Sequence, residues 1–245
     1  MNSHETEILK LQHIIRDLEQ KNEELELFVS HATHDLKEPI RSIGIGAEIL
    51  LKKHKDHLDA EANKMLEFML SSSKRFDNII SALKKYTVAD KGKLHISKVS
   101  VTNLVEEVLE DINILLKATQ AKIIIEELPT IETDKEKLKV VLTHVIENAL
   151  KYKGNNTPEI RIGSTKKEND YLIFVEDNGI GIEDNKQAHV LQPFERLHSK
   201  FEIEGMGLGL PLSQKILRRL NGELWLKSEA GKGTTIFISV PKTLH

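Results

Sequence analysis

The sequence His34-Asp35-Leu36-Lys37-Glu38-Pro39 places a histidine, an acid and a proline close together in a segment that is otherwise patterned as one long helix. The residues before it follow alternating steps of three and four, which is the a/d pattern of a coiled coil. The seam positions are Ile8, Leu11, Ile15, Leu18, Asn22, Leu25, Val29, Ala32 and Leu36. We therefore expect two copies of the chain to pair along this helix as a homodimer.

The heptad count also assigns the polar residues of this helix. Asn22 falls at an a position, where a buried amide costs stability but fixes the register and favours a parallel dimer; the alternative is an Asn22 at a frayed or solvated point. His34 falls at an f position, so its ring should point away from the seam and be exposed. Pro39 lacks an amide hydrogen, so the helix should bend there and then resume.

A second helix should follow the polar break at residues 52–59, with Asp56 or Asp59 as its N-terminal cap. Its apolar and aromatic residues recur at helical spacing, which is more typical of a core than of cofactor contacts. These residues are Met65, Phe68, Met69, Phe76, Ile79, Leu83 and Tyr86. Two helices joined by a short break form an antiparallel hairpin, and a pair of such hairpins forms a four-helix bundle.

Composition excludes several classes of function. The 245 residues carry a net charge of -3, so no global basic field favours nucleic acid or an anionic membrane. The chain has no cysteine, which excludes disulfides and thiolate chemistry and makes the cytoplasm the default compartment. It contains no run of roughly 18 consecutive apolar residues, so we expect no membrane segment.

Beyond the helical hairpin, the pattern changes to a mixture of strands and helices. The expected elements are helices at 104–116, 133–151 and 210–220 and strands at 121–126, 158–163, 171–177, 222–227 and 234–240. Thr133 or Asp134 should cap the long helix. Antiparallel hairpins mixed with helices indicate an α/β sandwich with the helices on one face, so the chain as a whole is an α+β multidomain protein.

Four clusters of polar residues and glycines punctuate this second part. They are His144–Tyr152, Asp177–Gly181, Pro193–Arg196 and Gly205–Leu210. Helical spacing puts His144, Asn148 and, nearly, Lys151 on one polar face of the long helix. Glycines at the start of a helix allow backbone amides to approach phosphate oxygens, and the helix dipole favours the anion.

In this order, the clusters resemble the N, G1, F and G2 boxes of the sensor histidine kinase catalytic domain, within the gyrase, heat-shock chaperone, mismatch-repair and histidine kinase ATPase superfamily. Ser30–Pro39 resembles the H box of the family's dimerisation and phosphotransfer domain, and Gly231–Phe237 resembles its closing strand motif. The resemblance covers about residues 20–241. The domains it implies are a coiled-coil stalk at 1–25, a dimerisation and histidine phosphotransfer domain at 26–88, a linker at 89–97 and a catalytic ATP-binding domain at 98–242.

The resemblance implies ATP as substrate and Mg²⁺ as cofactor. Asn148 would coordinate the Mg²⁺, and Lys151 would neutralise phosphate charge. Asp177 would accept a hydrogen bond from the adenine amino group, the alternative being a solvated turn acid. Tyr152 would lie against the base or ribose, the alternative being a core residue.

Further nucleotide-binding positions also follow from the resemblance. They are Gly179, Gly181, Phe194, Gly205, Gly207, Gly209 and Thr234. The first two glycines would let the chain pass close beside the nucleotide, and the last three would wrap the triphosphate. Phe194 would help to position the glycine-rich segment 178–209, a candidate lid, against the helical hairpin, unless Phe194 is an ordinary buried ring.

The chemistry centres on His34. A neutral imidazole is a usable nucleophile near pH 7, and phosphoryl transfer depends mostly on positioning and charge neutralisation. Asp35 can accept a hydrogen bond from one ring nitrogen and orient the other for attack. We predict a phosphohistidine at His34 that is passed to an aspartate in the receiver domain of a response regulator. The alternatives are His31, which occupies a c position without a following acid, and a metal site formed by both histidines and Asp35.

Two residues depart from the family pattern. Related kinases commonly have Asn where this chain has His144. Whether this histidine supports the residues that bind phosphate therefore stays open. Kinases that also dephosphorylate their partner often carry Thr or Asn where this chain has Glu38, which argues against phosphatase activity.

Residues 1–25 hold only coiled coil, so the chain is either a fragment of a longer kinase or receives its signal from a separate sensor protein through the stalk.

Two other classes of function compete with a kinase. One is a catalytically weak dimeric scaffold that binds nucleotide and recruits a regulator, which would not need His34, Asp35 and the nucleotide-binding residues together. The other is a clamp ATPase or an anti-sigma-type serine kinase. Those proteins lack an H box on a dimerising hairpin, and the usual clamp ATPase has Glu where His144 stands.

Overall fold

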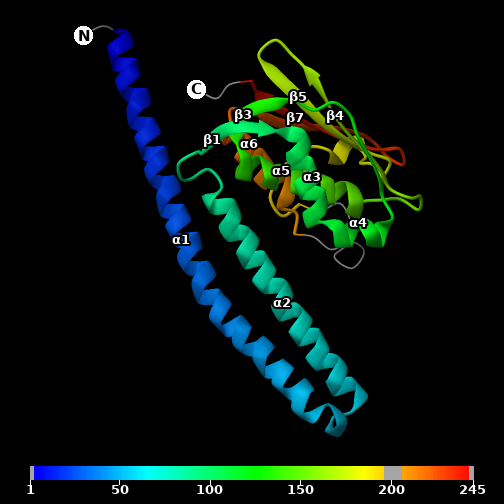
Figure 1. The fold of residues 1–245 in the computed structure, drawn as a ribbon. Helices are drawn as coiled ribbons and strands as arrows, with labels where there is room; N and C mark the ends of the chain where they lie inside the picture. Colours follow the sequence, from blue (N-terminus) through cyan, green and yellow to red (C-terminus); the bar gives the residue numbers. More distant parts are fainter. Residues whose placement is uncertain (1–2, 196–205, 243–245) are drawn as a thin grey trace. The chain divides into compact units, whose positions relative to one another are not determined.

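The computed structural model describes residues 3–195 and 206–242, and the chain divides into two compact units, residues 1–87 and 88–245. The first unit is an antiparallel hairpin of two long helices, α1 (Ser3–His54) and α2 (Ala60–Val88) (Figure 1). A short 3₁₀ turn, η1 (Lys55–His57), joins them. Asp59 Oδ1 accepts the Ala62 amide at 2.7 Å, so Asp59 rather than Asp56 caps the second helix.

The two helices of the hairpin approach closely near Gly44. The Ser73 hydroxyl of α2 donates to the Ile40 carbonyl of α1 at 2.8 Å, and a Cβ at Gly44 would lie only 2.4 Å from this hydroxyl oxygen. Pro39 lies inside α1, which continues beyond it to His54. The predicted resumption of the helix after the proline is therefore correct.

The predicted coiled-coil seam is exposed along the single chain. Leu25 is 60 % exposed and Leu36 is 49 % exposed, although leucine is usually buried. Other seam residues exposed to a similar degree are Ile8, Leu11, Ile15 and Leu18. The face that the heptad pattern assigns to a partner helix is thus left uncovered by the hairpin itself.

The second unit contains two sheets. A two-stranded sheet pairs β1 (Ile96–Ser100) with β3 (Thr130–Asp134), and a five-stranded sheet has the order β2-β4-β5-β7-β6. The strands of the larger sheet are β2 (Lys122–Ile125), β4 (Glu159–Lys166), β5 (Asp170–Asp177), β6 (Glu223–Glu229) and β7 (Gly233–Pro241). All neighbours in it are antiparallel except β2 and β4. The predicted strands are all present, whereas β1 and β3 were not predicted.

Helices cover one face of the larger sheet. They are α3 (Val101–Asp111), α4 (Asn113–Thr119), α5 (Lys135–Lys151) and α6 (Gly209–Arg219). Alternate residues of β7, Ile236, Ile238 and Val240, are buried and share the inward face with Ile173 of β5. Against them lies α5, in which Leu142 and neighbouring apolar residues are fully buried. This core fixes the position of α5, which carries the first polar cluster.

Helix boundaries in this unit follow local capping. The predicted helix 104–116 instead begins at Val101, because the Ser100 hydroxyl accepts the Asn103 amide, and it breaks at Ile112 into α3 and α4. Asp134 Oδ1 accepts the Lys137 amide at 3.1 Å, so Asp134 rather than Thr133 caps α5.

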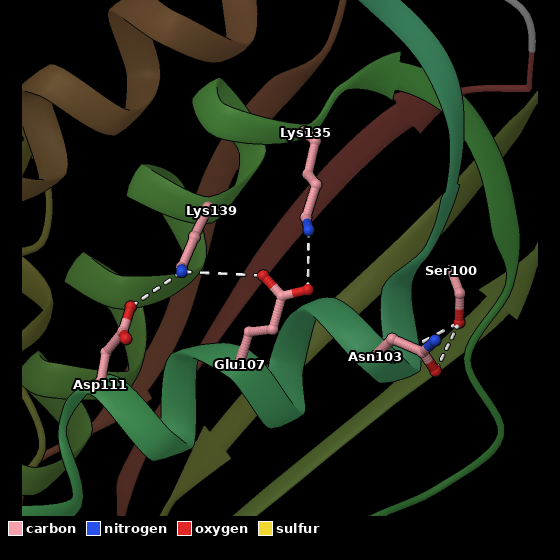
Figure 2. Close-up of polar contacts among 6 residues, drawn as sticks. All are labelled: Ser100, Asn103, Glu107, Asp111, Lys135 and Lys139. Carbon is pink, nitrogen blue, oxygen red and sulfur yellow. Dashed lines mark hydrogen bonds and ion pairs between the residues drawn. The ribbon is translucent and has the colours of Figure 1, made fainter.

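A partly exposed network of ion pairs joins α3 to α5. Figure 2 shows Glu107 of α3 pointing toward two lysines of α5, with its carboxylate 2.7 Å from Lys135 Nζ and 3.7 Å from Lys139 Nζ. Lys139 also pairs with Asp111 at 2.9 Å. Two short 3₁₀ turns, η2 (Asp184–Lys186) and η3 (His189–Leu191), precede α6.

The helices of the described part of the chain are either too short or too polar to cross a bilayer.

Candidate functional site

His34 lies on an exposed face of α1. Its side chain is 74 % exposed, and its Nδ1 lies 3.2 Å from Oδ1 of Asp35, the next residue. This distance suits a hydrogen bond in which Nδ1 carries the proton, which leaves Nε2 with a lone pair. Thr33, the preceding residue, is buried instead, and its hydroxyl donates to the Ser30 carbonyl. The sequence-predicted geometry of an accessible ring held by an acid is therefore present.

The alternatives to this arrangement have less support in the geometry. His31 is also exposed, but no ion pair with a neighbouring acid is found for it in the described part of the chain. The described residues contain no group of three His, Cys, Asp or Glu side chains arranged to hold a metal ion.

The polar face of α5 carries the first cluster of the second unit. Lys151 Nζ lies 2.7 Å from Oε2 of Glu147, one turn earlier, and both side chains are about one-third exposed. Asn148 is half-buried, and within residues 3–195 and 206–242 its carboxamide makes no hydrogen bond. A half-buried carboxamide with a free oxygen can serve as a ligand for Mg²⁺.

Asp177 ends β5, where pairing with β7 sets it opposite Thr234. Its Oδ1 accepts two backbone amides, Gly179 N at 2.8 Å and Thr234 N at 3.2 Å. Because both donors use the same oxygen, Oδ2 is left to accept a hydrogen bond from another group.

Burial changes the ionisation of this carboxyl. Removal from water raises the pKa of Asp177 to about 6, although the amides of Gly179 and Thr234 act in the opposite direction. The nearby Glu176 carboxylate adds a smaller upward contribution. Asp177 is therefore a half-buried acceptor whose charge changes just below neutral pH, a property common at functional sites.

The chain after Asp177 runs tightly against its neighbours. A Cβ at Gly179 would lie 2.4 Å from the Tyr152 carbonyl oxygen, which also accepts the Ile180 amide at 3.0 Å. Gly181 has a φ of +65°, and a Cβ there would lie 1.9 Å from the Glu229 carbonyl oxygen. Only glycine fits these two positions without displacing backbone. Tyr152 and Asp177 are both half-buried, and the turn at Gly179 brings the Tyr152 carbonyl close to the end of β5.

The glycine run leads into α6. Gly209 is the first residue of this helix, and no side chain caps its N-terminus in the described structure. The amides of Gly209 and Leu210 are therefore available to an anion, whereas Pro211 has no amide hydrogen and the Leu212 amide donates to the Leu208 carbonyl at 2.9 Å. Phe194 is 51 % exposed rather than buried. Its amide donates to the Gly207 carbonyl at 3.0 Å, so residues 194 and 207 lie next to each other. Gly205 and Arg196 lie outside the described residues.

Several contacts of the site involve residues that the sequence did not single out. Fully buried Ser213 of α6 contacts His144, and Ser228 of β6 contacts Thr234 with 2.8 Å between the hydroxyl oxygens. Gln187 donates to the Ser228 carbonyl at 2.8 Å. The sequence could have pointed to Ser213, because this residue lies four residues after Gly209 on the buried face of an amphipathic helix.

Two protein families match the chain. Residues 24–91 match the His Kinase A (phospho-acceptor) domain, which includes His34. Residues 133–244 match the histidine kinase-, DNA gyrase B-, and HSP90-like ATPase, which includes α5, Asp177 and the glycine run before α6. The first matched region lies mainly in the hairpin unit and the second lies in the sheet unit, in the order predicted from the motifs.

Relatives with similar sequences include a phytochrome and a sensor protein kinase. Cyanobacterial phytochrome A of a Nostoc species is 30% identical over 232 residues, which make up 95% of this chain and 30% of that protein. The sensor protein kinase WalK of Staphylococcus saprophyticus is 29% identical over 94% of this chain and 38% of its own length. The chain thus spans about a third of the length of these relatives.

Solved structures of histidine kinases share the fold. Full-length ShkA in complex with AMPPNP aligns with a TM-score of 0.67 and 18% identity, over 89% of this chain and 46% of that chain. ThkA in complex with response regulator protein TrrA aligns with a TM-score of 0.65 and 20% identity, over 93% of this chain and 66% of that chain. Together with the two family matches, these likenesses confirm the prediction of a helical region followed by an α/β ATP-binding domain.

Proposed function

Because the chain belongs to the sensor histidine kinase family, we propose that it transfers the γ-phosphoryl group of ATP to His34 and then to an aspartate in the receiver domain of a response regulator. The observation that carries this proposal is the exposed His34 ring with Nδ1 3.2 Å from Asp35. A nucleophile of this kind needs a bound phosphoryl donor, and the second unit offers the residues that would bind one.

The nucleotide would bind between Asp177 and the first turn of α6. Oδ2 of Asp177 can accept a hydrogen bond from the adenine amino group, because Oδ1 is already used by Gly179 and Thr234. Tyr152, half-buried and with its carbonyl next to Gly179, would lie against the base or ribose. The uncapped amides at Gly209 would bind the phosphates together with Lys151, whose ammonium would move from Glu147 to a phosphate oxygen.

Asn148 would provide the protein ligand for Mg²⁺. Its carboxamide oxygen is of the hard type that Mg²⁺ prefers, and one protein ligand suits an ion that is otherwise held by phosphates and water. When bound, Mg²⁺ would neutralise phosphate charge as the bond to the leaving group breaks.

In the transfer step, Nε2 of His34 uses its lone pair to form a bond to the γ-phosphorus. The bond between this phosphorus and the bridging oxygen breaks, and its electron pair leaves with ADP. Positive charge then develops on the imidazole, where the Asp35 carboxylate stabilises it through the Nδ1 proton. The receiver aspartate would later take the phosphoryl group and return His34 to its starting form.

The exposed seam of α1 supports the proposal of a homodimer. Leucines that are 49 to 60 % exposed in the single chain, such as Leu36 and Leu25, would be buried by a second copy. The same seam offers a route for a signal from a separate sensor protein or from sensory segments joined to the stalk.

The direct test is to incubate the protein with γ-labelled ATP and Mg²⁺ and then to measure the stability of the protein-bound label. We expect label that acid releases and alkali retains, as for a phosphoramidate. His34→Gln should reduce the label to background, whereas His31→Gln, the matched control one turn earlier, should leave most of it. Acid-stable label, or full labelling of His34→Gln, would contradict the proposal. Nucleotide binding without any label would instead favour the scaffold.

A further inference from the structure

His144 occupies the position in α5 one turn before Asn148, and its ring packs on the start of α6. A Cβ placed on Gly209 would lie 3.6 Å from Cγ of His144, which is an ordinary contact distance. The two helices therefore meet here through the imidazole, at the turn whose free amides face the proposed phosphate site.

A chain of hydrogen bonds crosses the same contact. His144 Nδ1 lies 3.3 Å from Ser213 Oγ, and the Ser213 hydroxyl donates to the Gly209 carbonyl at 2.9 Å. A hydroxyl has only one hydrogen, so while it donates to Gly209 it can only accept from His144. In this arrangement, Nδ1 of His144 is the donor to Ser213. Ser213 is fully buried, so water cannot readily replace either bond.

We propose that His144 is a positioning residue, whose Nδ1–H group acts through the Ser213 hydroxyl to hold the first turn of α6 where its amides bind the phosphates of ATP. The chain links the helix that carries Asn148 to the glycine turn, so it sets the two phosphate-binding elements relative to each other. This inference rests on the proposed function of the second unit as an ATP-binding domain.

The same geometry explains how this chain can carry histidine where related kinases commonly have asparagine. The Nδ2 atom of asparagine and the Nδ1 atom of histidine are separated from Cα by the same number of bonds, and both can donate a hydrogen bond. The Nε2 atom of glutamine instead corresponds to Nε2 of histidine. Replacing His144 by Asn should therefore keep the bond to Ser213, whereas replacing it by Gln should not.

The test measures the affinity of the full chain for ATP with Mg²⁺ and for adenosine, by calorimetry. Ser213→Ala and His144→Gln should each weaken ATP binding by about three- to tenfold, the size of one lost hydrogen bond. His144→Asn should stay within about twofold of the wild type by the same reasoning. Adenosine affinity should be unchanged in all three variants, because adenosine has no phosphates.

Ser164→Ala provides a matched control. This residue of β4 also donates its hydroxyl to a backbone carbonyl, that of Glu127, but it lies outside the proposed site. It should leave both affinities unchanged.

Three outcomes would overturn the proposed role of His144. They are wild-type ATP affinity in Ser213→Ala, equal losses for adenosine and ATP, and binding that is preserved in His144→Gln but lost in His144→Asn, which would indicate a direct contact through Nε2. Failure of the proposed function would look different, because the wild-type protein itself would not bind ATP.

Discussion

The two units of the chain differ in how completely each buries its apolar residues. The sheet unit encloses a continuous core in which Leu142, Ile146 and Ile173 are fully buried. The hairpin buries only a few residues, such as Ala47 and Ile80, and its large apolar side chains remain exposed, among them Phe28 and Phe68, each 69 % exposed. Apolar burial is the main favourable contribution to folding, so we expect the sheet unit to be stable alone and the hairpin to need the proposed second copy.

This difference matches the division of chemical roles that we propose. A nucleotide site depends on fixed distances, and the core beneath α5 and β5 holds Asn148 and Asp177 in place. A phosphoacceptor must instead be reached by other protein surfaces, and His34 lies on an exposed helix face. Stability of the hairpin should therefore depend on protein concentration, and that of the sheet unit should not.

The largest effect should come from a charge in the exposed seam. Leu25→Asp would place two carboxylates in the interface of the proposed dimer and remove two leucines from it. At about 1.5–3 kcal/mol for each leucine, dissociation should become more than a hundredfold easier. Sedimentation equilibrium should show a shift from dimer to monomer, while ATP affinity, which depends on the sheet unit, stays unchanged.

A core substitution in the other unit is the matched control. Leu142→Ala should lower the free energy of unfolding of the sheet unit by about 2–5 kcal/mol. Its midpoint in denaturant should be independent of protein concentration, and the dimer should persist. If Leu25→Asp left the protein dimeric, or if Leu142→Ala dissociated it, the distinction between the units would be wrong.

A smaller effect on the free energy of unfolding is expected at Asp177, a proposed binding residue whose buried charge destabilises the sheet unit. Burial raises the pKa of Asp177 to about 6 from 3.8, so between these values the folded state binds more protons than the unfolded state, and stability falls as pH rises. Above pH 6 the ionised carboxylate costs about 3 kcal/mol. Asp177→Asn should recover about this amount at pH 8 and almost none near pH 3, measured by denaturant unfolding.

The same variant should bind ATP poorly. Asparagine can keep Oδ1 toward Gly179 and Thr234, but an amide nitrogen then replaces Oδ2 and faces the adenine amino group with a donor. We expect roughly a tenfold to hundredfold loss of affinity. In the wild type, affinity should fall as pH drops below 6 and the carboxyl becomes protonated. An Asp177→Asn protein that lost stability at pH 8, or that bound ATP normally, would contradict this account.

Sequence periodicity predicted most elements because they are long and strongly patterned, as in α5 and β7. It missed β1 and β3, which are short strands that pair across about thirty residues, so no local pattern marks them. Within the proposed site, the sequence motifs contained Asn148 and Asp177, and the family resemblance implied their roles. The pairing of Asp177 with Thr234 depends on the register of β5 and β7, and the contact of His144 with Ser213 depends on the packing of α5 against α6, neither of which local sequence encodes.

The smallest effect should come from the ion pairs on the surface of the sheet unit (Figure 2). Lys135 and Lys139 lower the pKa of Glu107, chiefly through the hydrogen bond from Lys135, so the ionised carboxylate favours the folded state. That contribution is present above the ordinary pKa of a glutamate and is lost as pH falls through the lowered value. Exposed ion pairs are weak because water and salt screen them, and the apolar core below already joins α3 to α5. Glu107→Gln should therefore lower the melting temperature by only about 2–3 °C at pH 7 and low salt. The difference in melting temperature should disappear in 1 M salt and at low pH. A large drop in melting temperature that salt did not reduce would mean that the apolar core alone does not stabilise the sheet unit.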